Sequence, residues 1–85
     1  MDKNDSEIKL IQIELNKLAT IKTIQGGSCF QQKMHNVGIS ENKKIRLVSK
    51  GIFKGPFVVE LVDSYRQIVI GYGMASKIIV SVLNG

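Results

Sequence analysis

The chain has 85 residues, of which 44% are hydrophobic, and it carries a net charge of +5. This length allows a single domain, and the hydrophobic content is typical of a folded chain rather than a disordered one. The one cysteine, Cys29, excludes a disulfide-linked scaffold and favours a reducing compartment. No apolar stretch approaches the roughly 20 residues of a membrane span, and the charged N-terminus lacks the apolar core of a signal peptide. We therefore expect a cytoplasmic protein.

The charge is distributed unevenly along the chain. Residues 1–14 contain four acidic residues and two lysines, whereas the remainder contains ten lysines or arginines and three acidic residues. A basic domain of this kind is compatible with nucleic acid, an anionic membrane surface or an acidic protein partner. Excess lysine also keeps sheet proteins soluble and protects their edges, so the charge alone selects no partner.

The first predicted part of the chain is a polar, flexible N-terminal segment, residues 1–7, followed by a single domain over residues 8–85. The apolar residues of 8–18 fit both a helical stripe and a strand, and the pattern leaves both open. Residues 19–24 alternate apolar and polar side chains, as a strand with one solvated face does. The paired glycines in 25–27 end that strand, because they favour turns.

A short helix is predicted between Ser28 and Gly38. Ser28 suits the N-cap position, and Gln31 three residues later completes a capping box. The apolar stripe of this helix follows the spacing i, i+4, i+7: it consists of Phe30, Met34 and Val37. Gly38 is placed to end the helix in a left-handed conformation.

Four further strands are predicted after the helix, each with alternating apolar residues. They cover residues 44–49, 57–62, 66–70 and 78–82. A glycine- and proline-containing loop, 51–56, joins the first two, and residues 74–77 are expected to form one helical turn. Closing so short a sheet on itself removes exposed edges. The predicted fold is therefore mainly β: a small, SH3-like, partly closed barrel of five to six short strands with one short helix and a helical turn before the last strand. The short connections favour this form over an OB-like barrel.

The sequence offers no catalytic constellation. Cys29 and His35 lie six residues apart on the predicted helix, about 240° apart around its axis. They therefore point to different sides, with Cys29 expected at the core margin and His35 in solvent. The later carboxylates, Glu41, Glu60 and Asp63, are not spaced to share a substrate or a cation. We expect no enzyme and no catalytic, cofactor-binding or metal-ligating residues.

The tip of the loop between the predicted strands 44–49 and 57–62 is the least structural feature of the sequence. Ile52, Phe53 and Lys54 stand among glycines at what should be a solvated tip. Large exposed apolar residues often mark a contact surface, so these three are the first candidate partner contacts. Alternatively, Phe53 folds back over the open end of the barrel. Lys33 and Met34 on the helix are secondary candidate contacts.

Nucleic-acid binding is a second hypothesis for so basic a barrel. Small barrels bind single strands through aromatic platforms flanked by basic residues. The aromatic residues of this chain are scattered, Phe30 and Phe57 are expected in the core, and no strand alternates aromatic with basic residues. This hypothesis is therefore the weaker one.

Several segments in the same order resemble the FeoA family of ferrous-iron transport proteins. They are Ile21-Lys22-Thr23-Ile24-Gln25-Gly26-Gly27, the helix end Val37-Gly38-Ile39, the strand 43–49, Pro56 before the next strand, and the closing segment 70–80 with its alanine-bearing turn. The resemblance covers roughly residues 10–83.

The resemblance implies an SH3-like barrel that acts as a cytoplasmic accessory protein of bacterial ferrous-iron uptake. It implies binding to the cytosolic GTPase part of the membrane transporter FeoB, and modulation of that transporter. The same fold occurs as the C-terminal domain of metal-dependent repressors of the DtxR type. No cofactor is expected to be held tightly, although Fe(II) or another divalent transition metal can pass transiently. A direct metal chaperone remains an alternative, because a self-associated dimer can combine two copies of Cys29, His35 or the loop acids.

Overall fold

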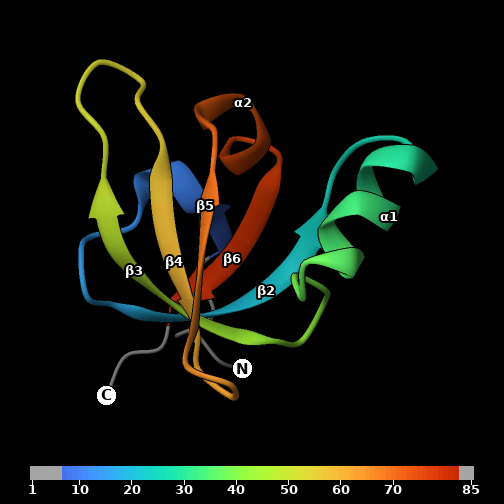
Figure 1. The fold of residues 1–85 in the computed structure, drawn as a ribbon, viewed down its shortest axis with the longest axis horizontal. Helices are drawn as coiled ribbons and strands as arrows, with labels where there is room; N and C mark the ends of the chain where they lie inside the picture. Colours follow the sequence, from blue (N-terminus) through green and yellow to red (C-terminus); the bar gives the residue numbers. More distant parts are fainter. Residues whose placement is uncertain (1–6, 83–85) are drawn as a thin grey trace.

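Six antiparallel strands form one curved sheet in the order β1-β6-β2-β3-β4-β5 (Figure 1). The computed structural model describes residues 7–82. The elements in chain order are β1 (Glu7–Lys9), the 3₁₀ turn η1 (Leu10–Gln12), β2 (Leu18–Ile24), α1 (Ser28–Asn36), β3 (Lys44–Lys50), β4 (Phe57–Leu61), β5 (Arg66–Ile70), α2 (Tyr72–Ala75) and β6 (Ile78–Val82). The predicted fold class is confirmed.

The predicted flexible segment 1–7 lies outside the described residues except for Glu7. Glu7 is the first residue of β1 and pairs with Ser81 of β6. The expected domain limits of 8–85 likewise extend three residues beyond the described part of the chain.

Two irregularities in strand pairing bend the sheet. The β2–β6 register shifts between Ile21 and Thr23, and the β3–β4 register shifts between Leu47 and Ser49. A bulge of this kind places an extra residue on one strand, which increases the local twist and bends the strand. The bends allow a sheet of short strands to curl around a single core.

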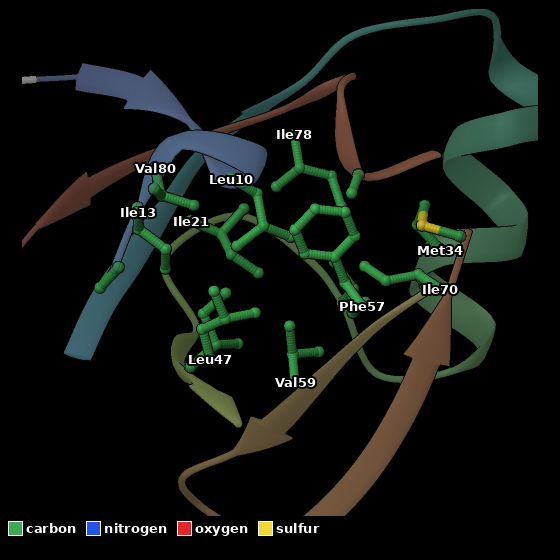
Figure 2. Packing of buried hydrophobic residues seen from close by; sticks show 14 of the residues in the cluster. Leu10, Ile13, Ile21, Met34, Leu47, Phe57, Val59, Ile70, Ile78 and Val80 are labelled. Carbon is green, nitrogen blue, oxygen red and sulfur yellow. The ribbon is translucent and has the colours of Figure 1, made fainter. Parts of the chain in front are cut away.

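The core lies on the inner face of the curved sheet and is almost wholly aliphatic (Figure 2). The predicted alternation is confirmed in β3, where Ile45 and Leu47 are buried, and in β4, where Phe57, Val59 and Leu61 are buried. The other large buried side chains come from the remaining elements: Leu10, Ile13, Ile21, Ile24, Met34, Ile39, Ile70, Ile78 and Val80. Apolar burial of this kind is the main favourable term in folding.

The ambiguous stretch 8–18 contains both a strand and a helical turn, each only three residues long. Pairing with β6 fixes Ile8 opposite Val80 in β1. The η1 turn then places Leu10 in the core, and Ile13 follows it there. Figure 2 shows Leu10 and Ile13 beside Ile21 and Val80. The short elements therefore owe their form to tertiary contacts rather than to a local pattern.

The N-terminus of α1 differs from the predicted capping box. Gly27 is the N-cap, and Ser28 is the first helical residue. Gln31 does not reach back to a cap residue; its side-chain amide donates to the carbonyl oxygens of Ile24 at 3.0 Å and of Gly26 at 3.2 Å. The prediction of Ser28 as the cap was therefore wrong. Gln31 instead ties the helix to the end of β2.

Replacing Gln31 by alanine is expected to lower the free energy of unfolding by about 1 kcal/mol, because two backbone carbonyls lose their donor. Urea denaturation followed by circular dichroism measures the change. Gln32→Ala is the matched control, since Gln32 bonds only the exposed side chain of Asn36. Equal effects of the two substitutions would show that the bonds to the β2 end contribute nothing.

The C-terminus of α1 confirms the role predicted for Gly38. Its φ is +101°, in the left-handed region. The amide of Ile39 donates to the carbonyl of Met34 at 2.8 Å, and the amide of Gly38 donates to that of His35 at 3.0 Å. These two bonds form a Schellman motif, and they turn the chain so that Ile39 enters the core.

The helical turn before β6 begins two residues earlier than predicted, since α2 covers Tyr72–Ala75 rather than 74–77. Gly71 is its N-cap. The early start buries Ala75 and packs Tyr72 against the core, with the Phe57 and Tyr72 ring centroids 6.2 Å apart.

Candidate interaction surfaces

The β3–β4 loop presents its tip to solvent. Ile52 is 79% exposed and Phe53 is 96% exposed. Phe53 and Lys54 both have positive φ, +54° and +63°. This left-handed conformation costs a non-glycine residue about 1–2 kcal/mol. Backbone strain of this kind is found preferentially at functional sites, so the loop tip (Ile52, Phe53 and Lys54) remains a candidate contact surface.

A hydrogen-bonded neck holds the loop tip in place. The amide of Gly51 donates to the carbonyl of Pro56 at 2.8 Å, and the amide of Gly55 donates to that of Ile52 at 3.1 Å. The loop stands at the same end of the molecule as α2 (Figure 1). The Nζ atom of Lys54 lies 5.7 Å from the centre of the Tyr72 ring, within the range of a cation–π contact.

Of the two sequence-based alternatives for Phe53, the structure has the exposed one. The ring does not fold back over the barrel, because Phe57 and Tyr72 already occupy that end of the core. Its role as a partner contact stays a prediction.

Lys33 and Met34 lie on a different surface from the loop tip. They line a groove of about 340 Å³ between α1, β5 and α2, which we call the edge groove. Its lining residues are Lys33, Met34, Asn36, Val37, Ile68, Val69, Ile70 and Met74. Met34 is only 3% exposed, so it forms the groove floor, and its role as a partner contact stays a prediction. It packs toward Ile70, as a member of the predicted apolar stripe of the helix (Figure 2).

Cys29 and His35 do not form a joint site. Cys29 is exposed rather than at the core margin, because its neighbour Phe30 is the residue of the first helical turn that packs against the core. His35 is exposed as expected, with its Nε2 atom 3.5 Å from a carboxylate oxygen of Glu41. Within residues 7–82, no three histidine, cysteine or acidic side chains come together as a group that could hold a metal ion.

Two acidic residues of the sheet and its turns, Glu60 and Asp63, have basic partners. Arg46 and Glu60 face each other across β3 and β4, with the Arg46 Nε atom donating to Glu60 at 3.1 Å and its Nη2 atom contacting the same oxygen. Asp63 lies 3.7 Å from the Nζ atom of Lys43. Opposite charges paired across strands stabilise their register. These carboxylates therefore serve the sheet and do not converge on a substrate site.

The exposed aromatic residues do not form a platform for bases. Phe53 stands in the loop before β4, whereas Tyr65 stands in the turn after it, at the other end of the strand. Phe57 is buried, and Phe30 packs against the core with the Nζ atom of Lys77 5.0 Å from its ring centre. Stacking of successive bases needs neighbouring rings. Nucleic-acid binding therefore stays the weaker of the two hypotheses.

The fold and these surfaces define a small SH3-like β domain. The family model of the FeoA domain matches residues 8–82. The chain belongs to the FeoA family, and membership implies a role in ferrous-iron transport. Within residues 7–82, no helix is long and apolar enough to cross a bilayer.

The solved structures with the same fold include FeoA proteins and metal-dependent repressors. A crystal structure described as an iron uptake regulatory protein (FeoA) superposes with a TM-score of 0.83 at 20% identity, covering 92% of this chain and 100% of the other. A FeoA-like protein from Clostridium acetobutylicum superposes with a TM-score of 0.79 at 22% identity, covering 93% of this chain and 90% of the other. A manganese-dependent transcriptional repressor superposes with a TM-score of 0.82 at 22% identity, covering 91% of this chain but 37% of the repressor. No curated protein matches the sequence.

Proposed function

We propose that this chain is a non-enzymatic, cytoplasmic accessory protein of bacterial ferrous-iron uptake that binds the cytosolic GTPase part of FeoB and modulates it. The single observation that carries the proposal is the loop tip, where two large apolar side chains face solvent on a backbone held in an unfavourable conformation. Exposed apolar side chains that stand together often mark a protein contact surface.

The chemistry of the remaining chain supports action by binding. Glu60 and Asp63 are paired with basic residues of the sheet and turns, and His35 contacts Glu41. A member of an iron-transport family whose acidic and histidine side chains have such partners can affect transport through contact with another protein. Fe(II) is then cargo of the transporter, and it meets this chain at most transiently.

The test is a binding measurement between the purified chain and the purified GTPase domain of FeoB from the same bacterium, in the GDP, GTP-analogue and nucleotide-free states. We expect binding in at least one state, and a change in the GTP hydrolysis rate when the chain is added. Absence of binding in every state would reject the proposal.

Phe53→Asp is expected to weaken this binding by about tenfold or more, as loss of a central apolar contact does. The fold should remain intact, with a change in unfolding free energy within about 0.5 kcal/mol, because the Phe53 ring buries almost nothing in the free protein. Isothermal calorimetry and urea denaturation measure the two effects.

Tyr65→Asp is the matched control for Phe53→Asp. Tyr65 is also exposed and also has a positive φ, but it lies at the opposite end of β4. Its substitution should leave binding unchanged. If both variants lose binding equally, or if Phe53→Asp unfolds the chain, the loop tip is not the contact surface.

A further inference from the structure

The two edges of the sheet are protected differently. The β1 edge is three residues long and exposes Glu7 and Lys9. The β5 edge is five residues long, pairs with β4 without any register shift, and contains no proline. Natural edge strands are normally kept short, bulged or charged, because an open ladder invites another strand. Only Arg66, at the start of β5, supplies a charge on this edge.

The outer side of β5 is free to pair. Within residues 7–82, the backbone of β5 hydrogen-bonds only to β4, and no side chain bonds to its other side. Val69 on this edge is 66% exposed, although it is an aliphatic strand residue. An extended segment laid against β5 would satisfy the free backbone groups and cover Val69.

The edge groove supplies a second wall for such a segment. Helix α1 lies across the groove from the β5 edge, and Met34 and Ile70 meet at its floor (Figure 2). Val37, which is half-buried, and Met74, which is exposed, add apolar surface. An edge strand facing a helix across an apolar groove can bind an extended peptide through main-chain pairing on one side and through side-chain pockets on the other.

Charge favours one class of occupant. Lys33 is the one charged residue that lines the groove within the described part of the chain, and Arg66 is the first residue of β5. A second copy of this chain would bring another net charge of +5, and like charges oppose association. An acidic side chain placed near Lys33 would be attracted instead.

We propose that the edge groove binds an extended segment of a different protein, which adds to β5 as a further strand, with apolar residues at alternate positions and an acidic residue near Lys33. This surface is separate from the loop tip, so the inference goes beyond the transporter contact proposed above. The domain is then an adaptor with two binding surfaces rather than one.

The test selects ligands from a random peptide library displayed on phage, with the full chain as bait. Enriched peptides are expected to alternate apolar residues and to carry Asp or Glu. Main-chain pairing is tested directly with synthetic versions of the best peptide. N-methylation of amides that face β5 should abolish binding, whereas methylation of the intervening amides should not. A selection without enriched peptides, or equal tolerance of N-methylation at all positions, would overturn the proposal.

Substitutions test whether the selected peptides bind in the edge groove. Val69→Lys places a charge on the open edge and should reduce peptide affinity by about tenfold or more. Lys33→Glu should reduce the affinity of acidic peptides by about two- to fivefold, as loss of a rim ion pair does. Leu15→Lys is the control, because Leu15 is an exposed aliphatic residue away from β5. Circular dichroism confirms that each variant is folded.

Self-association is measured in the same series by sedimentation. A dimer that Val69→Lys disrupts would identify a second copy as the occupant and overturn the assignment to another protein. The loop-tip variant Phe53→Asp should bind the selected peptides normally. Failure of the transporter contact and failure of the edge groove are therefore distinguishable.

Discussion

Alanine in place of Leu10 is expected to destabilise the domain by about 3 kcal/mol, which is a large part of its total stability. Leu10 is fully buried, although it belongs to a three-residue turn. Leucine-to-alanine changes in a packed core cost about 2–5 kcal/mol, because the cavity left behind closes only partly. A domain of this size has roughly 4–13 kcal/mol in total. Urea denaturation monitored by circular dichroism gives the value.

Leu15→Ala provides the control, because it removes the same atoms from a side chain that is 49% exposed five residues later. Its effect should stay within about 0.5 kcal/mol, as for most surface substitutions. Similar small effects from both leucines would mean that the segment before β2 does not belong to the folded core.

The contrast between Leu10 and the rest of the core shows which parts of the fold can be read from sequence. Strands β3 and β4 were predicted because each buries one face, which fixes an alternating pattern in Ile45 and Leu47 and in Phe57, Val59 and Leu61. The segment 8–18 contains elements of three residues, which are too short to show any period. Their form depends on pairing with β6, about 70 residues later in the chain.

The two ends of α1 also differ in how well the sequence predicts them. The turn at Gly38 was predictable, because a left-handed residue after a helix strongly favours glycine. The start of α1 was not, since Gly27 and Ser28 are both acceptable caps and the choice depends on the carbonyls of Ile24 and Gly26 that Gln31 binds. Side-chain bonds to a neighbouring strand leave no local signature.

The two candidate surfaces also differ in how well the sequence predicts them. The loop tip was accessible from sequence, because its apolar residues stand among glycines in a contiguous loop. The edge groove was not, because α1, β5 and α2 contribute its walls from separate parts of the chain. The signal that was available is Val69, an aliphatic residue on the polar face of a predicted strand. An exposed aliphatic residue at that position indicates apolar surface on the solvated face of the strand.

The loop tip and the neck beneath it depend on each other. The side chains of Ile52 and Phe53 bury little, so nothing in their own packing holds them in place. The neck bonds of Gly51 and Gly55 therefore fix the tip geometry. A fixed tip loses less conformational entropy when a partner binds, which makes the neck a determinant of affinity.

Replacing Gly51 by alanine is expected to open this neck. A Cβ atom at Gly51 would lie 2.5 Å from the carbonyl carbon of Gly55 and 2.7 Å from the nitrogen of Pro56. Both neighbours are backbone atoms, so the loop itself must move. Overpacking of this kind costs about 1–3 kcal/mol. We expect a comparable loss of stability, loss of hydrogen-exchange protection at the residue 51 amide, and weaker binding to the transporter domain.

Gly73→Ala separates the neck effect from a general effect of losing a glycine. A Cβ atom at Gly73 would meet nothing within 4 Å, and the residue lies inside α2, where alanine is favoured. Its variant should be as stable as the parent or slightly more so, with unchanged binding. If Gly51→Ala keeps full binding while its amide loses protection, the tip functions without a fixed geometry, and the strain at Phe53 and Lys54 has no role in recognition.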